Sequence, residues 1–465
     1  MSSSAWSRVS LPRSALAGPL LGPPLRDLQF LVLLLPVWWA LGIEQFVPPV
    51  LLTWSVLKLA AARRRLAFTP TAVCMAALLI AMLASSLFIV DDGRYVSFAR
   101  SFSVHLTALW VWLIVTTAVR DWRDVARLLR VVALAMAAAG VLGALGFLGI
   151  AELRFESPVG VLLPESLRAT DYGSVVAVRS TGQRSWFAGL QSYYRTNSIF
   201  LFSTMYAAAL ALTIPVVAFL REVARGWART GWTLLALLLA ANLLFTTGRV
   251  AVIACVAGAA VYLAVRTGLR TRAMLAALGF ALLAVLAVTT PASDAGETLE
   301  AAVLARGPGS LNARLQIYRE TVAGIERRPL LGWGSERDIE GLRYPAGSHS
   351  LYLGMLYRHG LIGLALFVAM LVATWRSSRP LAGTARGHAI GPPERFLLYG
   401  RWVFTALLVV GITTVPDVDA TLYLIAWTLL AALVATRRLL DRADAASDNP
   451  GGETAQRPPP HLPAP

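Results

Sequence analysis

Long apolar runs recur along most of this chain, and they restrict its fold more than any other feature of the sequence. Each run has about 20 residues, enough for a helix to cross a hydrocarbon core of roughly 30 Å. A soluble domain would show shorter, amphipathic segments instead. The other fold that can span a bilayer, a closed barrel, needs short alternating segments, and the sequence does not show them. We therefore expect an all-α polytopic membrane protein.

We expect about twelve spanning helices, joined by two long connections. The helices are predicted at about 28–43, 47–61, 69–90, 102–119, 131–150, 197–220, 232–247, 249–265, 272–291, 350–374, 396–415 and 419–436. Residues 1–26 form a Ser-, Pro- and Arg-rich cytoplasmic segment, and 27–440 form the membrane domain. The polar, Pro-rich tail 441–465 is predicted to be disordered. No cleavage-site pattern follows the first apolar run, so we interpret it as a retained helix.

The positive charge of the chain follows the predicted topology. With the N-terminus inside, the inner segments hold most of the 42 Lys and Arg but a minority of the 26 acidic residues. This asymmetry is typical of the positive-inside rule. The net charge of +16 therefore does not indicate nucleic-acid binding, which needs basic residues clustered on one folded face. Cys74 and Cys255 lie far apart in apolar runs and are expected to be unpaired, buried thiols.

The two long connections, at about 151–197 and 291–349, lie on the side predicted to face away from the cytoplasm. Antiparallel helices need only short connections, so long ones tend to carry function. In the second connection, apolar residues repeat at helical spacing and predict an amphipathic helix at the outer leaflet: Leu311, Leu315, Tyr318, Val322 and Ile325. Pro329 ends this helix, and Gly332 and Gly334 form the following turn.

Two residues of this region have chemistry that suits a catalytic site. Arg314 lies at the edge of the apolar stripe, and His349 stands where the connection enters a spanning helix. A helix N-terminus attracts anions and disfavours imidazolium, so a neutral imidazole there can accept a proton near pH 7. A structural interpretation remains open for both. Arg314 can rest its stem on lipid with its head in water, and His349 can simply cap the helix.

The order of these residues resembles the signature of the O-antigen ligase and polymerase superfamily. In that family a His followed by Asn, Ser or Gln precedes Gly-x-x-Gly, as His349-Ser350 precedes Gly360-Leu361-Ile362-Gly363 here. Arg314 followed by RRPLLGWG resembles the family's outer-loop pattern, and Thr247-Gly248-Arg249 resembles its Ser-Arg pair. The chain departs from the family where Gly precedes that arginine and where Leu364-Ala365 replaces Thr-Thr. The second departure weakens assignment to the ligase branch.

The resemblance spans about Arg195 to Gly363 and implies a lipid-dependent glycosyltransferase of the C type. It implies a donor glycan on a polyprenyl diphosphate, an acceptor hydroxyl on a second glycan or on lipid A core, and no cofactor. The enzyme would lie in the cytoplasmic (inner) membrane with its site on the outer, periplasmic face. Arginine forks match phosphate oxygens and stay charged. We therefore assign Arg249 and Arg314 to the diphosphate and His349 to the acceptor hydroxyl as base, although Arg249 can also be a plain interfacial arginine.

Four more residues are assigned to substrate binding: Arg195, Tyr318, Ser350 and Asp417. Asp417 and Asp419 form an Asp-x-Asp in the last outer loop, and Asp91-Asp92 ends the third helix. Such pairs hold a divalent cation in other membrane glycosyltransferases. Carboxylates in outer loops are more often only solvated, so we assign no metal. A single aspartate there can instead orient His349 or an arginine.

A solute transporter is the main alternative function, and a non-catalytic scaffold is another. A transporter predicts ionisable residues at mid-membrane and helices interrupted by Gly or Pro. The sequence shows no convincing internal repeat, and few charges lie deep in the predicted helices, with His105 the main exception. These observations favour the glycosyltransferase.

Overall fold

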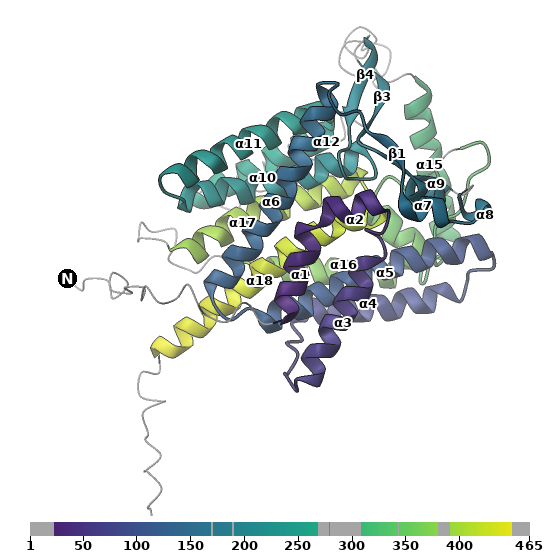
Figure 1. The fold of residues 1–465 in the computed structure, drawn as a ribbon. Coiled ribbons are helices and arrows are strands. Elements are labelled where there is room, and N and C mark those ends of the chain that lie inside the picture. The colour runs from purple at the N-terminus through teal and green to yellow at the C-terminus, as the bar shows by residue number, and fades with distance from the viewer. Residues whose placement is uncertain are drawn as a thin grey trace, which may run out of the picture.

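The computed structural model describes residues 23–168, 171–187, 190–267, 279, 308–342, 344–379 and 391–448. Over these residues the fold is a bundle of long apolar helices (Figure 1). Eight helices are long and apolar enough to cross a membrane, and the bent pair α1–α2 makes a ninth. The chain is therefore an all-α, multi-pass membrane protein, as predicted. The number of twelve spans stays a prediction, because the span predicted at 272–291 lies outside the described residues except for residue 279.

Twelve helices build the bundle over the described residues. They are α1 (Pro23–Leu33), α2 (Leu35–Leu41), α3 (Val47–Ala61), α4 (Pro70–Ser86), α5 (Asp92–Ala118), α6 (Trp122–Phe147), α10 (Ser203–Val223), α11 (Trp227–Phe245), α12 (Arg249–Arg266), α16 (Leu351–Ser377), α17 (Pro392–Thr413) and α18 (Ala420–Asp448). The axes of α1 and α2 differ by 63°, and Pro36 stands at this bend, where its ring prevents a continuous helix.

The connection between α6 and α10 is folded rather than irregular. It contains α7 (Pro158–Leu162), α8 (Glu165–Arg168), α9 (Asp171–Ala177), β1 (Arg154–Glu156), β2 (Val178–Ser180), β3 (Gly182–Phe187) and β4 (Leu190–Thr196). β1 pairs with β2 and β3 with β4, both antiparallel. We did not predict these strands. Thr181 joins the two sheets, since its Oγ1 lies 2.8 Å from the Tyr194 hydroxyl and its carbonyl oxygen accepts from the Asn197 amide.

The helix connections are bonded to one another at one end of the bundle, which we call the loop end. It comprises the α2–α3, α4–α5, α11–α12 and α17–α18 connections, residues 148–202, and α15 (Pro308–Arg327) with the loop that follows it. The Tyr193 hydroxyl donates to the Phe245 carbonyl oxygen (3.3 Å), and the Leu201 amide donates to Asp419 Oδ2 (2.8 Å). Arg179 pairs with Glu44 at 2.8 Å. These bonds join the α2–α3, α11–α12 and α17–α18 connections to the described part of the segment between α6 and α10.

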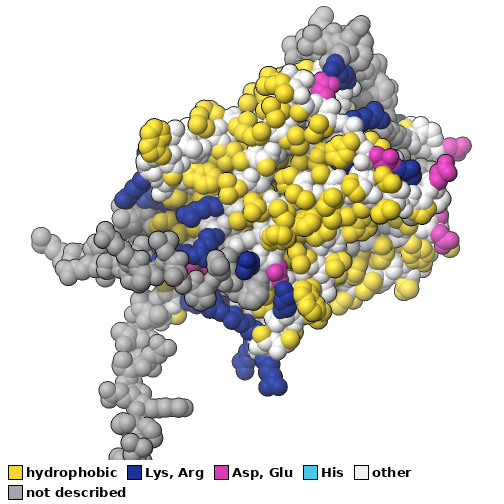
Figure 2. Space-filling model, viewed as in Figure 1, with side chains coloured by type: hydrophobic (Ala, Val, Ile, Leu, Met, Phe, Trp, Pro, Cys, Tyr) yellow, Lys and Arg dark blue, Asp and Glu magenta, His cyan; other side chains and the backbone are white. Residues whose placement is uncertain are grey.

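The opposite end, which we call the basic end, carries the α3–α4, α5–α6, α10–α11 and α16–α17 connections and the end of α18. It is bonded in the same way: the Ala67 amide donates to Thr117 Oγ1 (3.0 Å), and Arg438 donates to the Thr116 carbonyl oxygen (3.2 Å). Figure 2 shows Lys and Arg side chains gathered at the lower left, an apolar belt across the middle, and Asp and Glu side chains at the right edge. The bundle is therefore electrically asymmetric along its axis.

Several helix boundaries differ from those predicted. α5 begins at Asp92 rather than 102, and α6 begins at Trp122 rather than 131, because their first turns are polar but still helical. α4 ends at Ser86, so the prediction that Asp91-Asp92 ends that helix is wrong. Asp91 instead caps α5, since its Oδ1 accepts from the Gly93 amide at 3.0 Å. At the other terminus, α18 continues through the first part of the predicted tail to Asp448.

α16 is interrupted at Gly360, whose φ of 63° and ψ of −168° are not helical. The break leaves backbone groups of α16 without helical partners, and the loop after α15 supplies them. The Trp333 amide donates to the Tyr357 carbonyl oxygen (3.0 Å), and the Leu361 amide donates to the Pro329 carbonyl oxygen (2.7 Å). The loop after α15 therefore completes the hydrogen bonding of a helix that follows it in the chain.

Glycine is required where these two segments touch. A Cβ on Gly332 would lie 2.5 Å from the Tyr357 carbonyl oxygen, and a Cβ on Gly360 would collide with the Leu330 carbonyl group. Both residues also have positive φ, which glycine adopts without strain. The PLLGWG turn and the HGLIG segment are thus two halves of one interlocked structure, which explains why both belong to the same sequence signature.

Candidate functional site

Two of the arginines predicted to bind substrate lie beside the α11–α12 turn. Arg249 is the first residue of α12. Arg195, on β4, donates from Nε and Nη2 to the Thr246 carbonyl oxygen, each at 3.3 Å. Thr247 has a φ of 52°, which is uncommon for a residue other than glycine. The turn therefore brings Arg195 close to the start of α12.

Close packing accounts for the glycine that precedes Arg249. A Cβ on Gly248 would lie 2.5 Å from the Ala207 Cβ of α10. The smaller residue lets α10 and the start of α12 approach each other. This departure from the family's Ser-Arg pair thus has a packing reason.

His349 stands just outside the N-terminus of α16, as predicted. Ser350 is the N-cap, and its Oγ accepts from the Leu353 amide at 3.3 Å. The Tyr318 hydroxyl of α15 donates to the His349 carbonyl oxygen at 3.4 Å. The Tyr344 ring packs edge-on against the imidazole, with ring centroids 4.8 Å apart. His349 has a φ of 68°, so the loop holds it in a conformation that costs free energy. Tyr318 and Ser350 are thus brought to His349.

The arginine pair and the histidine lie at the same end of the bundle. α17 runs antiparallel to both helices that carry them. The Tyr352 hydroxyl, near the start of α16, donates to the Leu408 carbonyl oxygen near the end of α17 (2.9 Å). The Tyr262 ring, near the end of α12, packs on Tyr399 near the start of α17, with ring centroids 4.5 Å apart. α12 and α16 therefore both begin at the loop end.

α15 is helical over Pro308–Arg327, which confirms the predicted helix. The backbone of Arg314 belongs to this helix, but its side chain lies outside the described residues. Thr321 attaches the helix to the loop before His349, since its Oγ1 accepts from the Gly347 amide at 2.9 Å. α15 is thus fixed to the α16 entrance, with Arg314 on the same helix as Tyr318.

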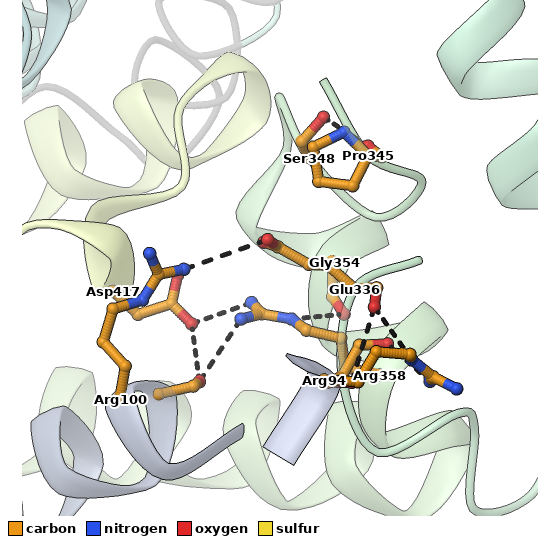
Figure 3. Close-up of polar contacts among 10 residues, drawn as sticks. Arg94, Arg100, Glu336, Pro345, Ser348, Gly354, Arg358 and Asp417 are labelled. Carbon is orange, nitrogen blue, oxygen red and sulfur yellow. Dashed lines mark hydrogen bonds and ion pairs between the residues drawn. The ribbon is translucent and has the colours of Figure 1, made fainter. Parts of the chain in front are cut away.

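Asp417 is not in a solvated loop, contrary to the expectation for the Asp-x-Asp motif. Its side chain is 1% exposed and pairs with Arg358 of α16, whose Nη2 lies 2.7 Å from Oδ2 (Figure 3). Arg358 also donates to Ser101 Oγ (3.3 Å) and to the Gly354 carbonyl oxygen (3.1 Å). Burial alone would raise the pKa of Asp417, but Arg358 and His105 outweigh it and lower that pKa below its usual value.

Asp419 has a structural role at the start of α18. Its Oδ1 accepts from the Leu422 amide (3.0 Å), and its Oδ2 accepts from the Leu201 amide (2.8 Å). Burial raises the pKa of this carboxyl, against the backbone hydrogen bonds that favour its charged form. In the part of the chain that the structure describes, no group of three or more His, Cys, Asp and Glu is placed to hold a metal ion.

Sequence reasoning missed Arg358 and His359, which are buried within a spanning helix. The statement that His105 is the main deep charge is therefore wrong. His105 is buried too, with Nδ1 2.8 Å from the Ser101 carbonyl oxygen. Neither ring nitrogen of His359 has a hydrogen-bond partner among the described residues. The sequence contained a signal for Arg358, because an arginine inside an apolar helix needs a buried carboxylate as its counter-charge. Such a carboxylate is then a candidate functional residue.

Comparison with known proteins agrees with the motif order. Residues 234–368 match a family model described as O-antigen ligase. The match runs from α11 into α16 and includes Arg249, α15, the PLLGWG turn and His349. No curated protein matches the chain at a significant level. Over this segment, the chain is similar to the membrane O-antigen ligases.

Proposed function

We propose that this protein transfers a glycan from a polyprenyl diphosphate to an acceptor hydroxyl at the loop end, which faces away from the cytoplasm in the cytoplasmic (inner) membrane. The observation that carries the proposal is the placement of Arg195, Arg249 and His349 at one end of the bundle, with Arg249 and His349 inside the segment that matches the O-antigen ligase family. Ser198, Thr247 and His349 all have positive φ, and strained backbone of this kind clusters at functional sites.

The chemistry divides between the arginines and the imidazole. His349 takes the proton of the acceptor hydroxyl as its oxygen attacks the anomeric carbon, and the bond between that carbon and the diphosphate oxygen breaks. Arg249 and Arg314, with Arg195 as a further contact, stabilise the negative charge that grows on the departing diphosphate. Tyr318 and Ser350 hold the histidine loop beside the substrate. Asp417 acts indirectly, by neutralising Arg358 in the helix that begins at this loop.

The acceptor decides between two reactions of the same kind. Leu364-Ala365 stands where the ligase branch has Thr-Thr, so we favour polymerisation, in which the acceptor is a second lipid-linked glycan. A ligase would use a hydroxyl of lipid A core. The lipid-linked intermediate that accumulates in a deletion strain separates them: single repeat units indicate a polymerase, and full-length chains indicate a ligase.

Complementation of the deletion strain tests the mechanism. His349→Ala and Arg249→Ala should each abolish the polymeric or ligated glycan, while Arg249→Lys keeps a charge but loses the bidentate fork and should retain only part of the activity. Arg229→Ala, on α11 at the basic end, is the matched control and should leave the product unchanged. Full product from both alanine variants, with the protein present in the membrane, would sink the mechanism.

Two observations keep a solute transporter as the second candidate. α16 is a broken helix, and Arg358, His359 and His105 are buried, as expected for a transport pathway. An observation against transport is that the backbone groups at the break form hydrogen bonds with the loop after α15, so these groups are not free to bind a solute. Uptake of a labelled solute into vesicles that contain the purified protein would favour transport.

A further inference from the structure

Three arginines gather around Trp333 at the loop end, and the proposed reaction does not use them. The guanidinium carbons of Arg328 and Arg337 each lie 4.3 Å from the centre of the Trp333 ring. Arg328 also lies 4.8 Å from the Phe88 ring, at the end of α4. Arg94 of α5 donates to the Trp333 carbonyl oxygen at 2.7 Å. We call Arg94, Arg328 and Arg337 the Trp333 cluster.

The Trp333 cluster holds more positive charge than its neighbours neutralise. Among the ion pairs of the described residues, none joins a carboxylate to any of its three arginines. Glu336, which lies nearby, is directed toward Arg100 at 3.9 Å. Asp91 acts on Arg94 only at longer range. Arg328 Nη1 is buried without a hydrogen-bond partner in the part of the chain that the structure describes, so no acceptor there offsets its charge.

The cluster stands where an apolar surface ends. Leu87 and Val90, beside Phe88, are 82% and 92% exposed, and Leu330, between Arg328 and Trp333, is 62% exposed. Below them α4 and α16 pack together, and both carry further exposed apolar residues: Val73, Ile80, Leu83, Leu361, Ile362 and Val368. In a membrane protein such a surface contacts acyl chains. The three arginines are therefore at the depth of lipid headgroups.

We propose that the Trp333 cluster binds the phosphate of an anionic phospholipid in the leaflet at the loop end. Arg337, which is exposed, supplies guanidinium donors to the phosphate oxygens, and Arg328, beside the Phe88 and Trp333 rings, adds positive charge. Arg94 adds charge while it holds the loop through the carbonyl oxygens of Trp333 and Glu336. The acyl chains lie along the exposed faces of α4 and α16. The bound lipid would brace the loop that fills the break in α16.

Hydrogen exchange of the full chain in nanodiscs tests this site directly. The discs contain phosphatidylcholine alone or phosphatidylcholine with increasing phosphatidylglycerol, and the readout is exchange of the amides at 336–342. We expect phosphatidylglycerol to slow this exchange in the wild type. Arg337→Gln should raise the phosphatidylglycerol concentration that gives half-maximal protection about fivefold. Arg328→Gln combined with Arg337→Gln should raise it further. Arg319→Gln, an exposed arginine of α15 outside the cluster, is the matched control and should respond like the wild type.

Each other outcome counts against the proposal. Equal protection in the wild type and in Arg337→Gln, or no effect of phosphatidylglycerol, would overturn it. Protection by inorganic phosphate in discs of phosphatidylcholine alone, without further effect of phosphatidylglycerol, would overturn the assignment to a lipid. If the double variant does not fold, the exposed Arg337→Gln and a charge-keeping Arg337→Lys decide the result. These results do not depend on whether the protein catalyses the glycosyl transfer proposed above.

Discussion

Burying the ion pair of Arg358 and Asp417 costs free energy, and its surroundings show how that cost is offset. Each charge loses its hydration, and the attraction between them offsets this only with good geometry and added hydrogen bonds. Ser101 provides these bonds, since its hydroxyl lies 3.3 Å from Arg358 Nη1 and 3.4 Å from Asp417 Oδ2. The pair therefore ties α16, α5 and the α17–α18 connection together beneath the candidate site.

Asp417→Asn should destabilise the protein by about 3–5 kcal/mol, because it leaves Arg358 buried without a counter-charge. Thermal unfolding of the purified protein in detergent gives the measurement. Glu152→Gln is the matched control: it breaks the Arg184–Glu152 pair at 2.7 Å, whose side chains are 59% and 31% exposed. An exposed pair contributes only about 0–1 kcal/mol. Similar losses in the two variants would contradict a special role for the buried pair.

Glu44 predicts a pH dependence of stability. It lies in the α2–α3 turn, and burial raises its pKa from 4.5 to about 7, although Arg179 pulls the pKa down. Between these values the folded protein keeps a proton that the unfolded chain releases. The free energy of unfolding should therefore fall as pH rises from 4.5 to 7, by at most about 3 kcal/mol, and then level off. Unfolding midpoints measured across this window should lose that slope in Glu44→Gln; parallel curves for the two proteins would refute the assignment.

At the scale of elements, the interlock between α16 and the loop after α15 connects the sequence signature to the site. The loop completes the hydrogen bonds at Gly360, and the first part of α16 carries His349 and Ser350 at its start. A change in how the loop packs would therefore shift the helix start that holds the histidine.

Gly360→Ala tests the interlock. The new Cβ would collide with the Leu330 carbonyl group at a positive φ, so we expect a loss of about 3 kcal/mol or more in stability, together with loss of glycan product. Gly149→Ala is the control, because Gly149 has a φ of 73° but nothing within 4 Å of a new Cβ. It should cost only about 1 kcal/mol and keep activity. Thermal unfolding and the complementation assay measure both, and equal effects would rule out the interlock.

The sequence predicted helices correctly where one local feature, such as apolar periodicity or a proline, determines where the helix lies. The helix at 47–61 was predicted to the residue, and the amphipathic helix and its Pro329 end were confirmed, because periodicity and proline act locally. The start of α5 was placed too late, since the prediction required apolar residues while Arg94 and Arg100 are helical at the polar end of the span. The strands β1–β4 are short and polar, and their pairing depends on partners that the local sequence does not reveal.

The sequence predicted which elements carry the candidate residues, but it did not predict their contacts. His349 was placed correctly at a helix entrance, because the polar connection stops there and the apolar run begins. The partners of Asp417 could not be inferred, since Arg358 and Ser101 come from helices far away in the sequence. The break in α16 was not predicted, because Gly360 lies inside an apolar run that was predicted as one continuous helix over 350–374.

For the whole molecule, the asymmetry of charge between the two ends predicts the orientation. By the positive-inside rule, we expect the basic end to stay in the cytoplasm and the end with the folded connection and α15 to cross the membrane. Arg64, in the α3–α4 connection, and Glu165, on α8, are both exposed and mark the two ends. Cysteine labelling can therefore test the orientation on which the proposed site depends.

In a background with Cys74→Ala and Cys255→Ala, a membrane-impermeant maleimide applied to spheroplasts should label Glu165→Cys at once and Arg64→Cys only after lysis. Alanine at the two native positions is tolerable because both thiols are free and lie in apolar helices. Labelling of Arg64→Cys before lysis would put the basic end outside. The arginines and His349 would then face the cytoplasm, and a glycan already carried across the membrane could not reach them, so this result would remove the physical basis of the proposed reaction.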